Sequence, residues 1–479
     1  MEVSAGAAIF LSASWAVRVG WANHARADHL PGVDVAGSDW VPGDSGSPHL
    51  ATNQSGHECG RWAFGLVIMQ RTTHDFVCGL YGSLPPANRT AQDSMAIPAK
   101  LTRSKAASIC AVLSLMGVLV PWAFSGTPRS ADFGSYYVAG RLLMHSPPLL
   151  YSIGVQHSEA VALHLTKFLP WAHPAPEALI FAPLSELSLE TAFHVWAIVN
   201  LLLLCLVVYG LRDYLAKLTV VEGYSVFACV LIPLGSGIAQ GQDHILTLLL
   251  YCAAFLLLQS GKETQAGLML GLALIRFQLT LPVLLCFLAL RRWRVIAGAV
   301  FATVGLIIAS FAIVGPGLFR TYLSALRYLG GHHDLFSAAE MPSIRGLVTM
   351  LIPHSGHVAT VTALVSIAIL LSAGWLWADK RSGPIQVVFA SSILIGLSVD
   401  YHAFLYELSV VALAGIILAP YARFSAALWF IGALEVVLLA SGAHLALLAP
   451  VLLGTGVSAI IHASTVDRRD ARKLQPSSG

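Results

Sequence analysis

Long apolar runs recur along the chain between residues 106 and 461, with short polar stretches between them. Most of these runs approach or reach the roughly 17–25 residues that an α-helix needs to cross a bilayer. They predict spans at 106–124, 191–211, 219–238, 245–258, 265–290, 295–314, 358–377, 385–399, 405–418, 426–440 and 445–461. The pattern predicts an all-α polytopic membrane protein with about twelve transmembrane helices, if the run 265–290 counts as two.

The run 265–290 is unusual because basic residues lie beyond both of its ends. Lys262 precedes it, and the motif RRWR at 291–294 follows it. Since basic residues favour the cytoplasmic side, both ends are expected inside. Two short helices, broken around residues 275–278, would satisfy this expectation. Such half-length helices occur at membrane depth where the break is buried in protein or lines a cavity.

Basic residues also orient the other spans. The segment 100–105 carries three basic residues before the first span, and Arg212 follows the second span. The positive-inside rule then places both termini in the cytoplasm. It makes 125–190 and 315–357 two long extracytoplasmic loops, and 464–479 a basic cytoplasmic tail.

Residues 1–94 differ from the rest of the chain. They are rich in Gly, Ser, His and Asp and show no sustained hydrophobic period. Glu2 stands where a signal peptide would have a basic region. Because the pattern changes at Met95, we expect the first 94 residues to be an over-extended reading frame, or else a poorly ordered tail. The membrane domain is then 95–463.

Composition supports the membrane assignment and excludes other classes. Of the 479 residues, 56% are hydrophobic and 11% are charged, whereas a soluble domain has about 25% charged residues. The net charge is +3 and the basic residues are scattered, so nucleic-acid binding is not indicated. The seven cysteines form no CxxC pair, which argues against a metal site or a disulfide framework.

Ionisable and polar residues concentrate at the expected outer ends of the spans. They are Asp132, His173, Gln242, Asp243, Asp334, Arg345, Asp400 and His402. Such residues at a membrane face indicate a functional site. In the stretch SADFGSYYVAGRLL, a helix beginning near Asp132 would place Tyr136 and Tyr137 close to one face, with Arg141 one turn further. The alternative is an interfacial helix with ordinary aromatic anchors.

Several motifs together resemble GT-C glycosyltransferases of family 87, which include polyprenyl-phosphate-mannose-dependent α-mannosyltransferases. The motifs are ADFGSYYVAGRLL, LLYSI, WAHPAPEALIFAPLSELSLETAFHVW, GQDHILTLLL, GLALIRFQLTLPVLLCFLALRRWR, PSIRGLV and DYHAFLYEL. They follow the family's order over about residues 100–460. The chain departs from the family at Arg276 and Phe277, where Lys-Pro is common, and at Asp243, where Asn is common.

The resemblance implies a GT-C bundle and a role for each polar residue. Asp132 is expected to be the catalytic base, with Tyr136 and Tyr137 lining the sugar site. Donor phosphate would be held by an arginine, which forks onto phosphate oxygens; the candidates are Arg141, Arg276 and Arg345. The remaining substrate-binding candidates are His173, Gln242 and His402. As alternatives, Arg141 would only pair with Asp132, and His173 would only fix a loop.

The expected function is inverting transfer of a hexose, with mannose favoured, from a polyprenyl-phosphate donor to a lipid-linked or glycan acceptor. The resemblance implies a bacterial inner membrane location, with the site facing outward. The chain has no Asp-x-Asp triplet, so we expect no metal and no cofactor. The competing functions are a secondary transporter, which would show midplane charges and two repeated halves, and a lipid flippase without transfer.

Overall fold

A computed structural model describes residues 117–129, 132–331, 340–353, 356–379, 384–419, 422–441 and 443–473. These residues form helices and turns, and none of them is in a strand. The N-terminal segment 1–94, most of the first expected span and Asp334 lie outside this part of the chain. The expectations about them stay predictions.

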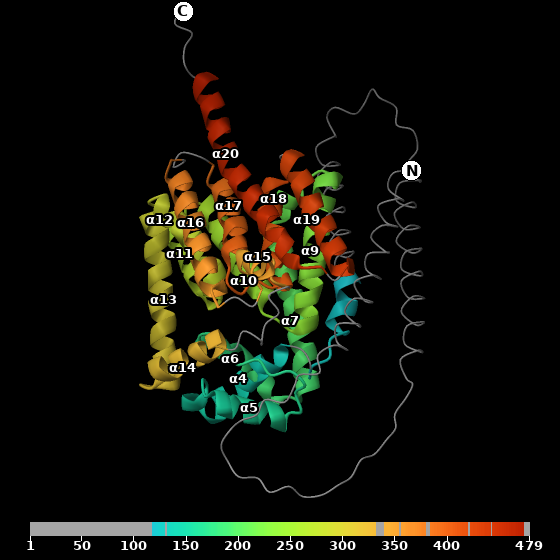
Figure 1. Cartoon of the computed structure of the whole chain (residues 1–479), viewed down its shortest axis with the longest axis vertical. Coiled ribbons are helices and arrows are strands. Elements are labelled where there is room, and N and C mark those ends of the chain that lie inside the picture. Colours follow the sequence, from blue (N-terminus) through green and yellow to red (C-terminus); the bar gives the residue numbers. More distant parts are fainter. Residues whose placement is uncertain are drawn as a thin grey trace, which may run out of the picture. The chain divides into compact units, whose positions relative to one another are not determined.

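Long apolar helices form a bundle (Figure 1). They are α7 (Leu189–Gly210), α9 (Val220–Gln240), α13 (Trp293–Val314), α16 (Val358–Asp379), α19 (Ala422–Ser441) and α20 (Ala449–Lys473). Three shorter members are α10 (His244–Gln259), α17 (Ile385–Val399) and α18 (Val411–Leu418). In the described part of the chain, seven helical segments are long and apolar enough to span a membrane, and one of them is the run Glu263–Ala289. A polytopic membrane protein is therefore supported, whereas the count of about twelve stays a prediction.

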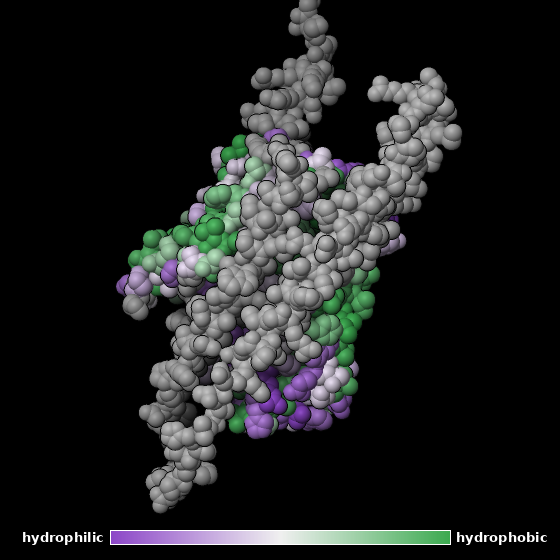
Figure 2. Space-filling view, turned by 90° about the vertical axis from the view of Figure 1, so that its right-hand side faces the viewer, coloured by the Kyte–Doolittle hydropathy of each residue, from purple (hydrophilic) through white to green (hydrophobic). Residues whose placement is uncertain are grey.

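The first expected loop folds into short helices rather than an extended chain. It contains α4 (Phe133–His145), α5 (Ile153–Ala162) and α6 (Ala175–Phe181), and the second expected loop contains α14 (Leu318–Gly331) and α15 (Ile344–Leu351). An aromatic cluster that includes Phe133, Phe181 and Trp196 packs α4 and α6 onto the end of α7. Figure 1 shows α4, α5, α6 and α14 together at one end of the bundle, and the polar surface in Figure 2 gathers at the same end.

The run 265–290 forms a helical hairpin. It consists of α11 (Glu263–Leu272), a 3-10 turn (Ala273–Arg276) and α12 (Phe277–Ala289). Arg292, just after α12, donates to Glu263 at the start of α11 at 2.8 Å. A straight helix over this run would separate these residues by about 40 Å. The prediction of two short helices is confirmed and their outer ends lie together, whereas the membrane side of these ends stays a prediction.

Four element ends meet at one place beneath α4. The tip of the hairpin lies beside the start of α10, the end of α17 and a 3-10 helix (Leu405–Val410). Gly241 has a φ of 67°, a left-handed conformation that glycine adopts readily, and it allows the chain to reverse between α9 and α10. Trp196 and Asn200 of α7 donate to the backbone carbonyls of this turn. The turn is thereby fixed, and the two residues after Gly241 are held facing α4.

Cysteine labelling tests the hairpin. In a cysteine-free background, Lys262→Cys and Arg291→Cys are expected to react from the same side of the membrane, because the hairpin brings its ends together. Ala162→Cys, in α5, is expected to react from the opposite side. A membrane-impermeant maleimide, applied before and after permeabilisation, measures this. Labelling of positions 262 and 291 from opposite sides would indicate a single straight span.

Glycine packing between α11 and α13 gives a second prediction. A Cβ atom at Gly298 would lie 2.1 Å from the Thr264 carbonyl oxygen, whereas one at Gly305 of the same helix would meet nothing within 4 Å. Gly298→Ala is therefore expected to lower the free energy of unfolding by about 1–3 kcal/mol. Gly305→Ala is the matched control and should not destabilise. Thermal unfolding of the two variants in detergent makes the comparison, and equal midpoints would contradict the packing.

Candidate active site

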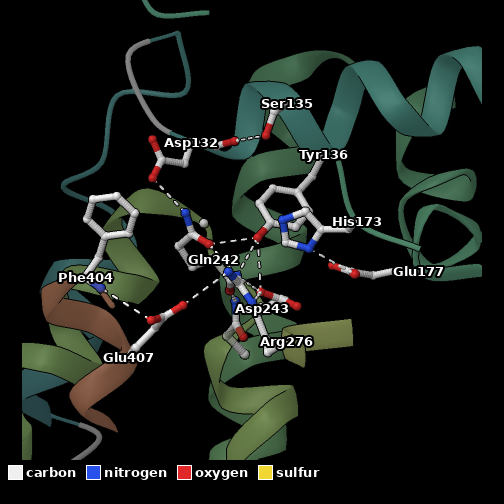
Figure 3. A network of polar contacts seen from close by, with 12 residues as sticks. Asp132, Ser135, Tyr136, His173, Glu177, Gln242, Asp243, Arg276, Phe404 and Glu407 are labelled. Atoms are coloured by element: carbon white, nitrogen blue, oxygen red, sulfur yellow. Dashed lines mark hydrogen bonds and ion pairs between the residues drawn. The ribbon is translucent and has the colours of Figure 1, made fainter. Parts of the chain in front are cut away.

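Asp132 lies at the outer edge of a buried polar network (Figure 3). It occupies the N-cap position of α4, and its backbone carbonyl accepts from the Ser135 hydroxyl at 2.9 Å. One carboxylate oxygen accepts from Lys167 at 2.9 Å and the other from the Gln242 amide at 2.7 Å. The side chain is 8% exposed, whereas that of Lys167 is 49% exposed. Asp132 is thus oriented from both sides and lies directly below a solvent-accessible cation.

Tyr136 joins the outer layer to the bundle. Its hydroxyl lies 2.7 Å from Gln242 Oε1 and 3.0 Å from Asp243 Oδ1, and it donates to one of these acceptors. The same hydroxyl accepts from the Arg276 guanidinium at 2.8 Å. Tyr136 comes from α4, Gln242 and Asp243 from the turn before α10, and Arg276 from the hairpin tip. Three segments distant in sequence therefore share one set of hydrogen bonds.

Arg276 is the centre of this network. It pairs with Asp243, donates to Gln242 Oε1 at 2.8 Å and lies 3.4 Å from Glu407 Oε1. The other oxygen of Glu407 accepts from the backbone N–H of Phe404 at 3.3 Å. Arg276 and Glu407 also line a cavity of about 10 Å³, which is room for one water molecule. The guanidinium thus faces acidic and amide partners with all three nitrogens.

His173 and Glu177 form a second pair next to Tyr136. His173 Nδ1 lies 3.1 Å from Glu177 Oε2, and the imidazole stacks on Trp171 with the ring centres 4.7 Å apart. Burial raises the pKa of Glu177 to about 7, although His173 opposes the shift. Burial alone would also raise the pKa of Asp243, but the Arg276 guanidinium outweighs it and lowers that pKa below its usual range. The two carboxyl groups therefore have different proton affinities.

Arg345 and His402 lie together at the bundle side of the network. Arg345 donates to the Tyr401 carbonyl at 3.1 Å, lies 3.1 Å from His402 Nδ1 and stacks over the Tyr401 ring. Asp400 accepts from the His402 backbone N–H at 2.8 Å, and burial raises the pKa of Asp400 to about 6. Among the described residues, Arg345 makes no ion pair with a carboxylate. It is a buried cation with unused hydrogen-bonding capacity for an anion.

Three side chains in this site could together bind a metal ion. His173, Glu177 and Asp243 each offer one nitrogen or oxygen, and these atoms lie within 4.8 Å of one another. They come from two segments, the entry to α6 and the turn before α10. No short sequence motif contains all three.

Two expected site residues lie elsewhere. The Tyr137 hydroxyl donates to the Leu187 carbonyl at 2.7 Å and so helps to fix the outer layer. Arg141 pairs with Glu159 of α5 at 3.2 Å, so the alternative in which Arg141 only pairs with Asp132 is wrong. Arg141 is two turns beyond Asp132 on α4, and the α5 carboxylate is the acid it meets. Lys167 takes the place next to Asp132.

Sequence reasoning did not place Lys167, Glu177 and Glu407 in the site. Lys167 is not part of any of the motifs and does not follow an apolar run. Its proximity to Asp132 depends on how the segment after α5 packs against the start of α4. Glu177 was visible four residues after His173, a spacing that places two side chains near each other at a helix start. Glu407 lies in an apolar segment, where a carboxylate by itself signals a buried partner.

Comparison with known proteins gives one match. Residues 171–405 match the model of glycosyltransferase family 87. This segment includes His173, Gln242, Arg276, Arg345 and His402 and excludes Asp132. No curated protein and no solved structure matches the chain.

The buried charge network predicts the effect of removing its cation. Arg276→Ala would leave Asp243 and Glu407 without their buried counter-charge. Loss of one partner of a buried ion pair lowers stability by about 3–5 kcal/mol, and thermal unfolding in detergent should show a decrease of this size. Adding Asp243→Asn should restore part of it, because fewer unpaired charges remain. Arg212→Ala, at a pair that is at least half exposed, is the control, and an equal effect there would contradict the network.

Proposed function

We propose that the chain is a member of glycosyltransferase family 87, whose model matches residues 171–405, and that it transfers a hexose, with mannose favoured, from a polyprenyl-phosphate donor. The acceptor is a hydroxyl of a lipid-linked sugar or glycan. The reaction takes place at the outer face of a bacterial inner membrane and inverts the anomeric configuration. A GT-C bundle is the fold that this membership implies.

The observation that carries the proposal is the position of Asp132. Its carboxylate accepts one hydrogen bond on each oxygen, although a carboxylate has about four lone-pair sites. It therefore keeps acceptor capacity for a hydroxyl proton. Gln242 and Lys167 orient the side chain from two directions, and the half-exposed Lys167 marks the side from which an acceptor can approach. These are the requirements for a general base.

In the proposed reaction, Asp132 takes the proton of the acceptor hydroxyl as its oxygen attacks the anomeric carbon of the donor. The bond from this carbon to the phosphate oxygen breaks on the opposite face, and the lipid phosphate leaves with the electron pair. Its charge needs a cation. Arg345 suits this role best because it has no ion pair among the described residues, whereas Arg276 already faces two carboxylates.

Transport or flipping without transfer is the competing function. The hairpin is compatible with transport, since broken helices are also found in transporters. A transporter would have its polar site near the bilayer midplane. Asp132 instead lies at the outer edge of the network, next to the folded outer layer, and this argues against transport. Formation of a glycosylated product by the purified chain, analysed by mass spectrometry, separates the two functions.

Asp132→Asn tests the base. The amide keeps the size of the side chain and still accepts a hydrogen bond, but it does not take a proton. Sugar transfer from a polyprenyl-phosphate donor should fall by about 10²–10⁴-fold, with donor binding largely retained. Asp213→Asn, at a side chain that is 77% exposed, is the matched control. Near wild-type transfer by Asp132→Asn would make Asp132 a structural residue.

A further inference from the structure

A cluster of three potential ligands lies on the inner side of Tyr136. His173, Glu177 and Asp243 place one ligand atom each within 4.8 Å of the others. Two ligand atoms bound to one divalent ion at about 2.0–2.2 Å lie at most about 4.4 Å apart, which is slightly less than this. The three side chains could therefore close on one ion with small rotations and no change in the backbone.

Two buried acceptor atoms at this cluster have no hydrogen-bond partner among the described residues. Glu177 Oε1 and Asp243 Oδ2 accept no hydrogen bond from any described residue. Glu177 is 2% exposed and Asp243 is fully buried. A buried carboxylate oxygen without a partner is strongly unfavourable, and native proteins rarely leave one so. Two such oxygens beside one imidazole are available as ligands for a shared cation.

The site holds more carboxyl groups than cationic side chains. The five carboxyl groups are those of Asp132, Glu177, Asp243, Asp400 and Glu407. The three cations other than histidine are Lys167, Arg276 and Arg345. A donor phosphate would bring negative charge into this site, and a bound divalent ion would offset it.

We propose that His173, Glu177 and Asp243 bind a divalent transition-metal ion, which accepts a phosphate oxygen of the donor as a further ligand. One imidazole and two carboxylates suit Mn²⁺ or Zn²⁺ better than Mg²⁺, which prefers oxygen ligands and keeps its waters. Trp171 stacks on His173, and Tyr136 and Arg276 contact the other oxygen of Asp243. Such outer contacts orient metal ligands.

The phosphate part of this inference rests on the proposed function, but ion binding does not. Mn²⁺ titration of the purified full chain in detergent, followed by the loss of the free-ion electron paramagnetic resonance signal, measures binding directly. The expected result is one bound Mn²⁺ per chain, with Mg²⁺ failing to displace it at equal concentration. Glu177→Gln and His173→Ala should each weaken binding by at least about 100-fold, more than outer-shell changes do.

Matched controls lie in the same outer layer. Glu159→Gln removes a carboxylate that pairs with Arg141, and His157→Ala removes an imidazole that packs on Phe168. Both variants should bind Mn²⁺ as the wild type does. Equal loss in a control and in Glu177→Gln would mean that the ion binds elsewhere, and it would overturn the proposed site.

Two measurements separate the ion from the function. If the wild-type chain transfers sugar but binds no Mn²⁺ or Zn²⁺, the ion site is wrong and Glu177 and Asp243 share a proton instead. If it binds the ion at this site but transfers no sugar from a polyprenyl-phosphate donor, the ion site stands and the proposed function is wrong. Increased donor affinity in the presence of Mn²⁺, absent in Glu177→Gln, would support both.

Discussion

The contact between Arg276 and the acids around it is the interaction on which the rest of the site depends. An arginine in an apolar span is unfavourable by about 2.5–3.5 kcal/mol on insertion scales. Here the hairpin carries it to a tip where Asp243, Glu407, Gln242 and Tyr136 satisfy its nitrogens. Because these partners come from α4, the turn before α10 and the segment after α17, one side chain links segments that are far apart in the sequence.

The site lies where two differently built layers meet. The outer layer is held by aromatic packing around Phe133, Phe181 and Trp196, and it contributes Asp132, Tyr136 and His173. The bundle contributes the polar ends of its short helices. The close approach of Gly298 and Gly267 to neighbouring backbones lets α11 lie against α13, which anchors the hairpin. A shift in either layer would separate Asp132 from the groups that orient it.

The two layers also divide the chemistry. Lys167 and His173 remain partly exposed, whereas Arg276, Asp243 and Glu407 are enclosed. Charge in the enclosed part interacts more strongly because the surroundings screen it less. Asp132, which is 8% exposed and pairs with the half-exposed Lys167, lies at the boundary between these two parts.

The sequence by itself determined the helices and the hairpin. Apolar run length placed α7, α9, α13 and α16 within a few residues, because the bilayer fixes how long a span must be. Basic residues beyond both ends of the run 265–290 predicted the break, since the positive-inside rule places both ends on the cytoplasmic side. The motifs also indicated the family whose model residues 171–405 match. Run length, flanking basic residues and motifs are all local features, which can be read from residues close together in the sequence.

Only the tertiary structure decided which polar side chains meet. Tyr136 and Tyr137 are adjacent in sequence, yet one reaches Arg276 and the other the Leu187 carbonyl. Arg141 pairs with Glu159 rather than with Asp132, and Asp132 pairs with Lys167. A hydrogen bond depends on a few ångströms and on direction, and these are fixed by how α4, α5 and the bundle pack. No spacing along a single chain contains that information.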